Sequence, residues 1–347
     1  MTAGGREPIE IVGGGLAGLG LGLALQRAGV PTVVFEAHDY PRHRVCGEFL
    51  TGLDAETVAQ LGLTPLLADA CRLRRVTWHR RERPIYAHTL PAPALGLSRH
   101  ALDARLAETY VAAGGDLRVR VRVPPEPAPA GRVFALGRRR RPSPWIGLKA
   151  HVRGLHLSGD LEMHLGDRAY VGLSGVEGGR VNVCGLFPRR PAAPEEHAGT
   201  GFTVLLRHLR AAGLPGLARR LETADLVDGS FCAVASLSFL WGQPTPGRLC
   251  LGDSFAMTPP FTGNGMAMAL QSAVIARDPL LAWQHGELDW PAAAGVANQR
   301  LRQRFRSRLT AANVLHPFLL EPRRQHWLAL AGRARLLPLR PFYRLTH

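Results

Sequence analysis

Lysine is almost absent from this 347-residue chain: of its 43 basic residues, only Lys149 is a lysine. With 27 acidic residues the net charge is +16, a balance that favours partners such as nucleic acid. An arginine surplus of this kind is, however, as typical of coding bias as of a selected surface. The arginine run at 138–141 also lacks interleaved aromatic residues that could stack on bases. We therefore predict no nucleic-acid partner.

Cysteine is scarce as well. The five cysteines are scattered without C-x-x-C spacing, which excludes a disulfide framework and a zinc ribbon and fits a reducing compartment. The apolar run at 11–25 contains six glycines; it is too short to span a membrane and is a poor signal peptide. The histidines show no metal-ligand spacing. We therefore predict a cytoplasmic protein without a metal site.

The chain does contain enough apolar sequence for a sizeable core, because 46% of its residues are hydrophobic. Residues 8–37 are typical of a strand, a glycine-rich turn, a helix and a second strand, the βαβ opening of a dinucleotide-binding fold. Short strands between glycine-rich turns fill residues 151–187, and 202–221 favours a helix. A strand at 248–252 and a helix at 264–283 then return to the first pattern.

This order predicts an α/β (α+β) fold. A Rossmann-type domain (residues 1–75, 98–149 and 245–299) is interrupted by a mainly antiparallel β-sheet substrate domain (76–97 and 150–244). Residues 300–347, with 11 arginines against the single acid Glu321, are expected to form a basic helical C-terminal segment. This segment either packs on the core with solvated arginines or docks an acidic carrier protein or an anionic membrane surface.

The first nucleotide-binding motif is Gly13-x-Gly15-x-x-Gly18, with Leu16 and Ala17 between the last two glycines. It follows a strand and opens a helix, where the helix amino terminus can bind a pyrophosphate. Glu36 ends the second strand, next to Ala37, where a carboxylate can accept hydrogen bonds from an adenosine ribose. The same carboxylate repels a 2′-phosphate, so NADP is excluded as the tightly bound nucleotide. The motif leaves NAD and FAD open.

A second motif lies 235 residues further on. Gly252-Asp253 follows a strand, and 259–265 (PPFTGNG) leads into a helix. Asp253 can bind a ribitol or ribose hydroxyl, and a helix that starts near Asn264 directs its N–H groups at an electron-rich group.

Together these residues resemble the flavoprotein hydroxylase superfamily of p-hydroxybenzoate hydroxylase, and most closely its geranylgeranyl reductase-like and halogenase-like branches. The resemblance extends over residues 9–273 and implies FAD as the cofactor. It places Asp253 on the ribityl chain of FAD and a set of following residues along the isoalloxazine, namely Pro260, Gly263, Asn264, Gly265 and Met266.

Two shorter segments agree with this resemblance. Arg44-Val45-Cys46-Gly47-Glu48 is similar to the R-x-C-G-E loop that lies beside the flavin in the reductase-like branch. Ser98-Arg99, followed by Asp103, resembles a helix start whose arginine reaches the cofactor phosphates. Arg44, Cys46, Gly47 and Arg99 are therefore expected to contact FAD.

The sequence also departs from the family pattern. Leu136 stands where these hydroxylases usually carry an aspartate that assists reduction by a nicotinamide, so the electron donor is either NAD(P)H or a separate flavin reductase. The W-x-W-x-I-P motif of halogenases is missing, which argues against halogenation.

Two residues are candidates for catalysis. Glu48, expected near the flavin, could relay a proton if burial raised its pKa; alternatively it is a loop carboxylate bonded to backbone or to Arg44. Lys149 is chemically distinct from the many arginines, because its ammonium is compact and titratable.

The resemblance implies an FAD-dependent oxidoreductase. The leading interpretation is a monooxygenase of secondary metabolism that hydroxylates or oxidises an apolar aromatic or polyketide-like small molecule, with a flavin hydroperoxide as oxidant. The R-x-C-G-E loop keeps open a flavin-dependent reductase of isoprenoid C=C bonds. A non-catalytic flavin- or lipid-binding protein is the third possibility.

Overall fold

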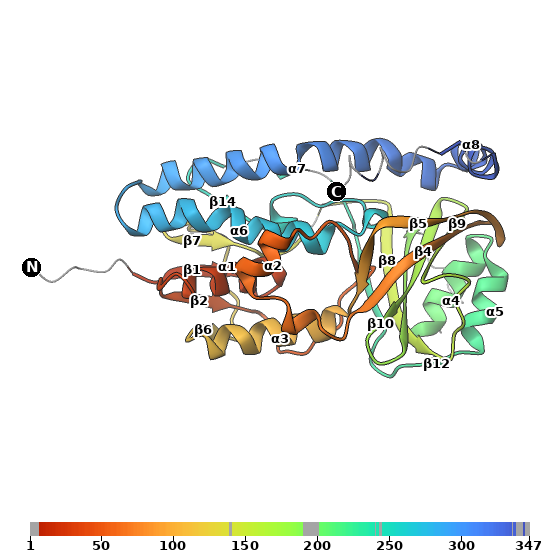
Figure 1. Ribbon diagram of the computed structural model, residues 1–347, viewed down its shortest axis with the longest axis horizontal. Helices are drawn as coiled ribbons and strands as arrows, with labels where there is room; N and C mark the ends of the chain where they lie inside the picture. Colours follow the sequence, from red (N-terminus) through yellow and green to blue (C-terminus); the bar gives the residue numbers. More distant parts are fainter. Residues whose placement is uncertain are drawn as a thin grey trace, which may run out of the picture.

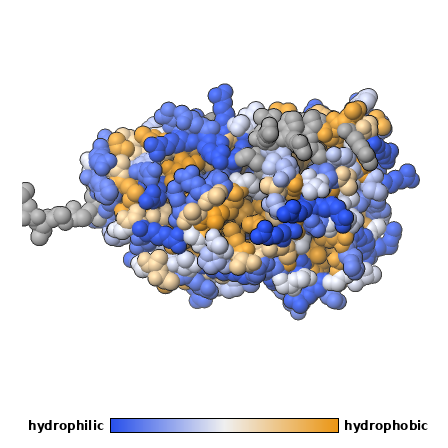
Figure 2. All heavy atoms as spheres, viewed as in Figure 1, coloured by the Kyte–Doolittle hydropathy of each residue, from blue (hydrophilic) through white to orange (hydrophobic). Residues whose placement is uncertain are grey.

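The computed structural model describes residues 7–138, 141–189, 201–239, 241–242, 245–334, 336–337 and 343. A parallel sheet lies at one end of the molecule and a larger, mainly antiparallel sheet at the other (Figure 1). On the face shown in Figure 2, apolar side chains gather in the middle and hydrophilic side chains border them.

The parallel sheet has the strand order β14–β7–β1–β2–β6, and every ladder in it is parallel. Its strands are β1 (Ile9–Val12), β2 (Thr32–Phe35), β6 (Asp116–Arg118), β7 (Arg132–Phe134) and β14 (Leu249–Cys250). The last strand joins β7 from more than a hundred residues away. The chain therefore leaves this sheet and returns to it, as predicted for an interrupted Rossmann-type domain.

Helix α1 (Leu16–Gln26) packs against this sheet and against α3 (Arg99–Ala112) and α6 (Gly265–Gln284). All its residues from Leu16 to Leu25 are buried, so apolar burial on every side stabilises it. A Cβ at Gly20 would lie 3.3 Å from Cβ of Ala273 on α6. Glycine at this position thus allows the two helices to approach closely, next to the short helix α2 (Ala55–Leu61).

The second sheet runs in the order β12–β8–β11–β10–β9–β4–β5–β3, and β13 also pairs with β8. All its ladders are antiparallel except β4 with β9, so the prediction of a mainly antiparallel sheet is confirmed. Its strands are β3 (Phe49–Leu50), β4 (Cys71–Arg80), β5 (Arg83–Gly96), β8 (Trp145–Arg153), β9 (Leu161–Gly166), β10 (Ala169–Val176), β11 (Arg180–Pro188), β12 (Asp225–Leu226) and β13 (Cys232–Ala235).

Helices α4 (Phe202–Ala211) and α5 (Pro215–Glu222) cover one face of this sheet (Figure 1). The single helix expected over 202–221 is therefore two helices. Gly213 has a positive φ of 74° and Pro215 begins the second helix, so the chain turns between them.

Helix α7 (Trp290–Leu320) lies along α6 and continues to β9 and β10 of the second sheet, and α8 (Pro322–Arg333) packs on β5 (Figure 1). The expected domain limits at residues 75, 149 and 299 fall inside β4, β8 and α7, because each element continues past the composition change. Residues 335, 338–342 and 344–347 of the expected basic segment lie outside the described residues. None of the described helices is both long and apolar enough to cross a membrane.

Candidate cofactor and substrate site

The glycine-rich turn between β1 and α1 requires its glycines for two different reasons. Gly13 has a φ of 113°, and a Cβ there would lie 2.2 Å from the carbonyl oxygen of Ala135. A Cβ on Gly18 would lie 1.9 Å from the carbonyl oxygen of Gly13. A Cβ on Gly15, in contrast, would meet only Arg99 Nη2, 3.8 Å away. Gly15 therefore opens toward Arg99, and a phosphate group at this place could contact both.

Glu36 at the end of β2 fixes the same turn. Its Oε2 accepts a hydrogen bond from Gly14 N at 2.9 Å, and its Oε1 accepts one from His38 N at 3.1 Å. Each carboxylate oxygen still has a free lone pair. Glu36 lines the neighbouring cleft, so it can accept further hydrogen bonds from a ribose.

Arg99 begins α3 directly after the helix cap Ser98, whose Oγ accepts a hydrogen bond from Ala101 N at 3.0 Å. Its guanidinium binds the buried Asp103 carboxylate through two bonds of 2.7 and 2.8 Å, and Arg44 Nε donates to the same carboxylate at 3.1 Å. Asp103 thus holds two arginines that the resemblance assigns to FAD, and both line the cleft.

The second motif approaches the cleft from the other side. Asp253 lies in the short 3-10 helix Gly252–Ser254 after β14, and its side chain is exposed to the cleft. Within the described residues its carboxylate has no hydrogen-bond partner. A second 3-10 helix, η4 (Pro260–Thr262), and the left-handed Gly263 (φ 69°) lead into α6.

These segments enclose a cleft of about 580 Å³. All the residues predicted to bind the cofactor line it except Gly18, which packs on the turn, and Asn264. The Asn264 side chain is buried, and its Oδ1 accepts a hydrogen bond from Thr51 Oγ1 at 3.1 Å. Sequence reasoning missed other lining residues, among them Val121, Arg122, Val123, Cys232, Ala233 and Val234. The first three follow β6, and the carboxyl end of a parallel strand is where ligand sites gather.

A second, apolar cavity of about 190 Å³ adjoins the cleft. The two are separated by η4: Pro260 and Gly263 line the cleft, whereas Phe261 and Thr262 line the apolar cavity. Phe49 lines both. The other walls come from β4, β5, β9 and the end of α7 and include Val76, Trp78, Ile85, Leu161, Met163 and Leu319.

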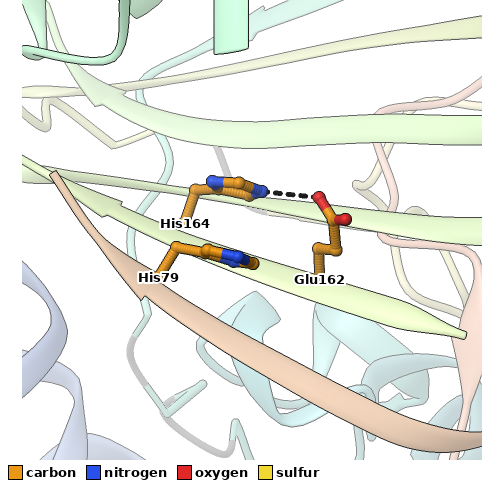
Figure 3. Close-up of side chains that lie close together, drawn as sticks. All are labelled: His79, Glu162 and His164. Carbon is orange, nitrogen blue, oxygen red and sulfur yellow. Dashed lines mark hydrogen bonds and ion pairs between the residues drawn. The ribbon is translucent and has the colours of Figure 1, made fainter. Parts of the chain in front are cut away.

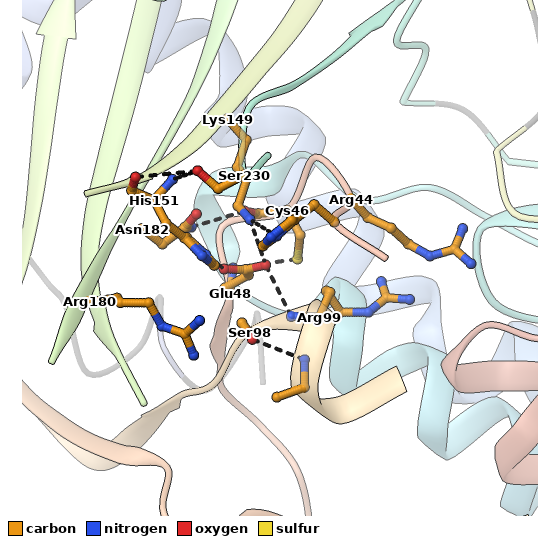
Figure 4. A network of polar contacts seen from close by, with 12 residues as sticks. Arg44, Cys46, Glu48, Ser98, Arg99, Lys149, His151, Arg180, Asn182 and Ser230 are labelled. Carbon is orange, nitrogen blue, oxygen red and sulfur yellow. Dashed lines mark hydrogen bonds and ion pairs between the residues drawn. The ribbon is translucent and has the colours of Figure 1, made fainter. Parts of the chain in front are cut away.

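Glu48 and Lys149 meet in a buried polar network at the edge of the cleft (Figure 4). The Lys149 Nζ lies 3.2 Å from Glu48 Oε1, and both side chains are fully buried. The same oxygen accepts a hydrogen bond from Arg99 N at 3.0 Å, and His151 Nε2 is hydrogen-bonded to Oε2. Glu48 therefore bonds backbone, as one alternative stated, but it does not pair with Arg44.

This network lowers the pKa of Glu48. Burial alone would raise it, but the His151 hydrogen bond and the charge of Lys149 outweigh burial. The condition for the proton-relay alternative, a raised pKa, is therefore not met, and the network favours the ionised form of Glu48. Lys149 Nζ is also 3.0 Å from His43 Nδ1, and burial together with Lys149 lowers the His43 pKa to about 3. His43 is thus neutral, and its Nδ1 accepts a hydrogen bond from the Lys149 ammonium.

His151 was not predicted as a site residue, although the sequence contained a signal for it. Lys149 and His151 are two positions apart on one strand, so their side chains point to the same face of the sheet. Leu136, where the family pattern has an aspartate, lines the cleft and is 48% exposed. No charged group stands at this position.

Comparisons with known proteins address the fold. No family model matches the sequence. A squalene monooxygenase of Panax ginseng is 57% identical over 38 residues, which are 11% of this chain and 7% of that protein. Among solved structures, a single-residue variant of Klebsiella pneumoniae HpxO complexed with FAD has a TM-score of 0.75 at 17% identity, with 98% of this chain and 97% of that chain covered. The chain therefore has the same fold as this FAD-bound protein.

Two further structures support this assignment of the fold. Pseudomonas aeruginosa PqsL, solved with 2-aminobenzoylacetate, has a TM-score of 0.70 at 17% identity and covers 94% of this chain and 99% of its own. The flavin-dependent brominase Bmp2 has a TM-score of 0.70 at 18% identity and covers 97% and 92%. The fold shared with these proteins therefore extends over nearly the whole chain.

Proposed function

We propose that this protein is an FAD-dependent monooxygenase that hydroxylates or oxidises an apolar, aromatic or polyketide-like small molecule. The observation that carries the proposal is the position of η4 between the two cavities. One side of this helix lines the cofactor cleft, and its other side lines the apolar cavity. A flavin ring along Pro260 and Gly263 would thus lie beside a molecule in contact with Phe261.

The residues of the cleft fit FAD. Gly15 and Arg99 face one another where a pyrophosphate can lie, Glu36 has lone pairs for a ribose, and the Asp253 carboxylate lies free in the cleft for a ribityl hydroxyl. Bound FAD supplies the activation of molecular oxygen. One oxygen atom enters the substrate and the other leaves as water; a nicotinamide or a reductase supplies the two electrons, and the two protons come from the donor and from solvent.

The apolar cavity supports a small, flat substrate. Its described walls carry no aspartate, glutamate, lysine or arginine, so a charged molecule would lose its hydration there without a partner. Aromatic side chains such as Trp78 and Phe261 can stack on an aromatic substrate. The aromatic ligand named for PqsL agrees with this class.

We propose that the buried network of Glu48, Lys149 and His43 positions the loop beside the cofactor cleft. Glu48 is ionised, so it fixes the loop beside the cleft rather than donating a proton. Lys149 is a positioning residue that acts through Glu48, and its Nζ holds a proton between Glu48 Oε1 and His43 Nδ1. His43 lines the cleft, so the network extends from Glu48 and Lys149 to the site.

The C-terminal region supports docking on an anionic membrane surface. Five large apolar residues are exposed on α7, on α8 and just after them, among arginines: Val314, Phe318, Trp327, Leu330 and Leu336. Apolar side chains insert between headgroups while arginines pair with phosphates. Flotation with anionic but not neutral vesicles tests this. Retention on an acidic carrier protein without flotation would contradict it.

Oxygen consumption tests the function. With FAD and NADPH, NADH or a flavin reductase, oxygen uptake should rise when an apolar aromatic compound is added, and one labelled oxygen atom should appear in the product. Anaerobic saturation of an isoprenoid C=C bond would instead identify a reductase. Bound FAD without turnover in either assay would indicate a flavin-binding protein.

A further inference from the structure

Three side chains that no part of the cofactor site uses meet on the second sheet (Figure 3). In the parallel ladder between β4 and β9, His79 lies directly opposite His164. Glu162 precedes His164 by two residues, so its side chain is on the same face of the sheet. The potential ligand atoms of the three residues all lie within 4.8 Å of one another. The sequence showed no metal-ligand spacing, because His79 is brought to Glu162 and His164 only by the pairing of β4 with β9.

The two imidazoles are stacked, with ring centroids 4.5 Å apart and planes inclined by 6°. His164 Nε2 is 2.8 Å from Glu162 Oε2. Tetrahedral zinc with ligand bonds of about 2.0–2.2 Å separates its ligand atoms by roughly 3.4 Å. For a metal to replace the proton shared by His164 and Glu162, the stacked imidazoles would rotate so that their in-plane lone pairs converge on the ion.

His79 provides the independent indication of a ligand. It is 9% exposed, its Nδ1 is buried without a partner, and no hydrogen bond to it is found among the described residues. A buried imidazole in this state loses the hydrogen bonds that it has in water. A neutral imidazole in this position would have a ring nitrogen lone pair available for a ligand.

The surroundings leave room for further ligands. His79 and His164 line a cavity of about 520 Å³ between the sheet and α5. Two further contacts stabilise the ionised form of Glu162. Its Oε1 accepts a hydrogen bond from Ser158 N at 2.6 Å, and Arg220 binds both carboxylate oxygens. Arg220 orients the carboxylate, but its charge also opposes a cation.

We propose that His79, Glu162 and His164 form a binding site for a divalent transition metal, with zinc as the ion best suited to two imidazoles and one carboxylate. Water from the cavity would complete the coordination. The site would tie β4 to β9, strands that are separated by 80 residues of chain. It is distinct from the cofactor cleft and does not depend on the proposed oxidoreductase activity.

The test is zinc binding by tag-free full-length protein after dialysis against a chelator. We expect one zinc per chain by equilibrium dialysis and elemental analysis, and a rise in Tm of about 4 °C at a hundredfold excess of zinc over Kd. His79→Gln should weaken binding at least tenfold and remove the Tm shift. His285→Ala, which removes an exposed histidine elsewhere, should change neither.

Arg220→Gln supplies the second variant. It removes the opposing charge while Ser158 still holds Glu162, so zinc should bind as tightly as in the wild type or more tightly. Circular dichroism of each variant without metal controls for folding. Absence of stoichiometric binding in the wild type, or equal binding by His79→Gln, would overturn the proposal.

Discussion

The Lys149 ammonium and the Glu48 carboxylate form an ion pair of 3.2 Å in which both side chains are fully buried. The two residues are 101 positions apart and come from a loop and from the strand β8. Their pairing joins the edge of the cofactor cleft to the second sheet, and it explains why the one lysine of this arginine-rich chain is not on the surface. Arginine is longer and demands more hydrogen-bond acceptors than this position offers.

Removal of Lys149 should therefore be costly. Lys149→Met keeps the length of the side chain but leaves Glu48 buried without its cation, which destabilises a fold by about 3–5 kcal/mol. Denaturant unfolding measures this loss. The double variant Glu48→Gln/Lys149→Met should regain much of it, because no charge is then left unpaired. A single variant as stable as the wild type would show that the pair contributes nothing.

Asp253 should determine much of the affinity for FAD. Asp253→Asn keeps the shape of the side chain but removes its charge, and hydrogen bonds to charged groups contribute about 1.5–3 kcal/mol. The Kd for FAD, measured by quenching of flavin fluorescence, should rise about tenfold or more. Asp278→Asn is the matched control, because Asp278 is exposed on α6 and pairs with Arg277, and neither residue lines the cleft. Equal affinities for all three proteins would refute the role of Asp253.

Substitutions in the apolar cavity should change kcat/KM for the substrate without changing the affinity for FAD. Met163 on β9 lines this cavity but not the cleft. Met163→Trp should fill the cavity and reduce kcat/KM for the aromatic substrate at least tenfold, while the Kd for FAD stays unchanged. Met163→Leu, which conserves volume, should retain activity. A loss of FAD binding in the tryptophan variant would mean that the two cavities are not independent.

His316 should make stability dependent on pH. It is buried next to Phe261 and Tyr170, and burial lowers its pKa to about 4. Between pH 6.5 and 4 the unfolded chain binds a proton at this residue and the folded protein does not, so stability falls as pH falls through this range, by up to about 3 kcal/mol. His316→Gln should lose less stability than the wild type between pH 7 and pH 4.5 in denaturant unfolding. Identical slopes would contradict the assignment.

The sequence was sufficient for features that a short segment defines. Gly13, Gly15 and Gly18 occur within six residues, so their spacing predicted a nucleotide-binding turn. The family resemblance, not the spacing, placed Gly252-Asp253 on the same cofactor. The mainly antiparallel second sheet was likewise predictable, because its strands are short and separated by glycine-rich turns.

Features that depend on pairing between distant segments could not be predicted. The contact of Glu48 with Lys149 requires the position of a loop against β8. The approach of His79 to His164 requires the register of a parallel ladder between strands that are far apart in sequence. The ends of β4, β8 and α7 were unpredictable for a similar reason, since these elements extend beyond the residues at which the composition changes.

The most direct test of the account is whether the purified full-length protein retains FAD. The protein should be incubated with FAD, passed through a desalting column and examined by visible absorption. We predict flavin absorption bands that correspond to about one FAD per chain and that bleach when NADPH, NADH or a flavin reductase is added under anaerobic conditions. A folded protein that emerges without flavin bands would contradict the assignment of the cleft and, with it, the proposed function.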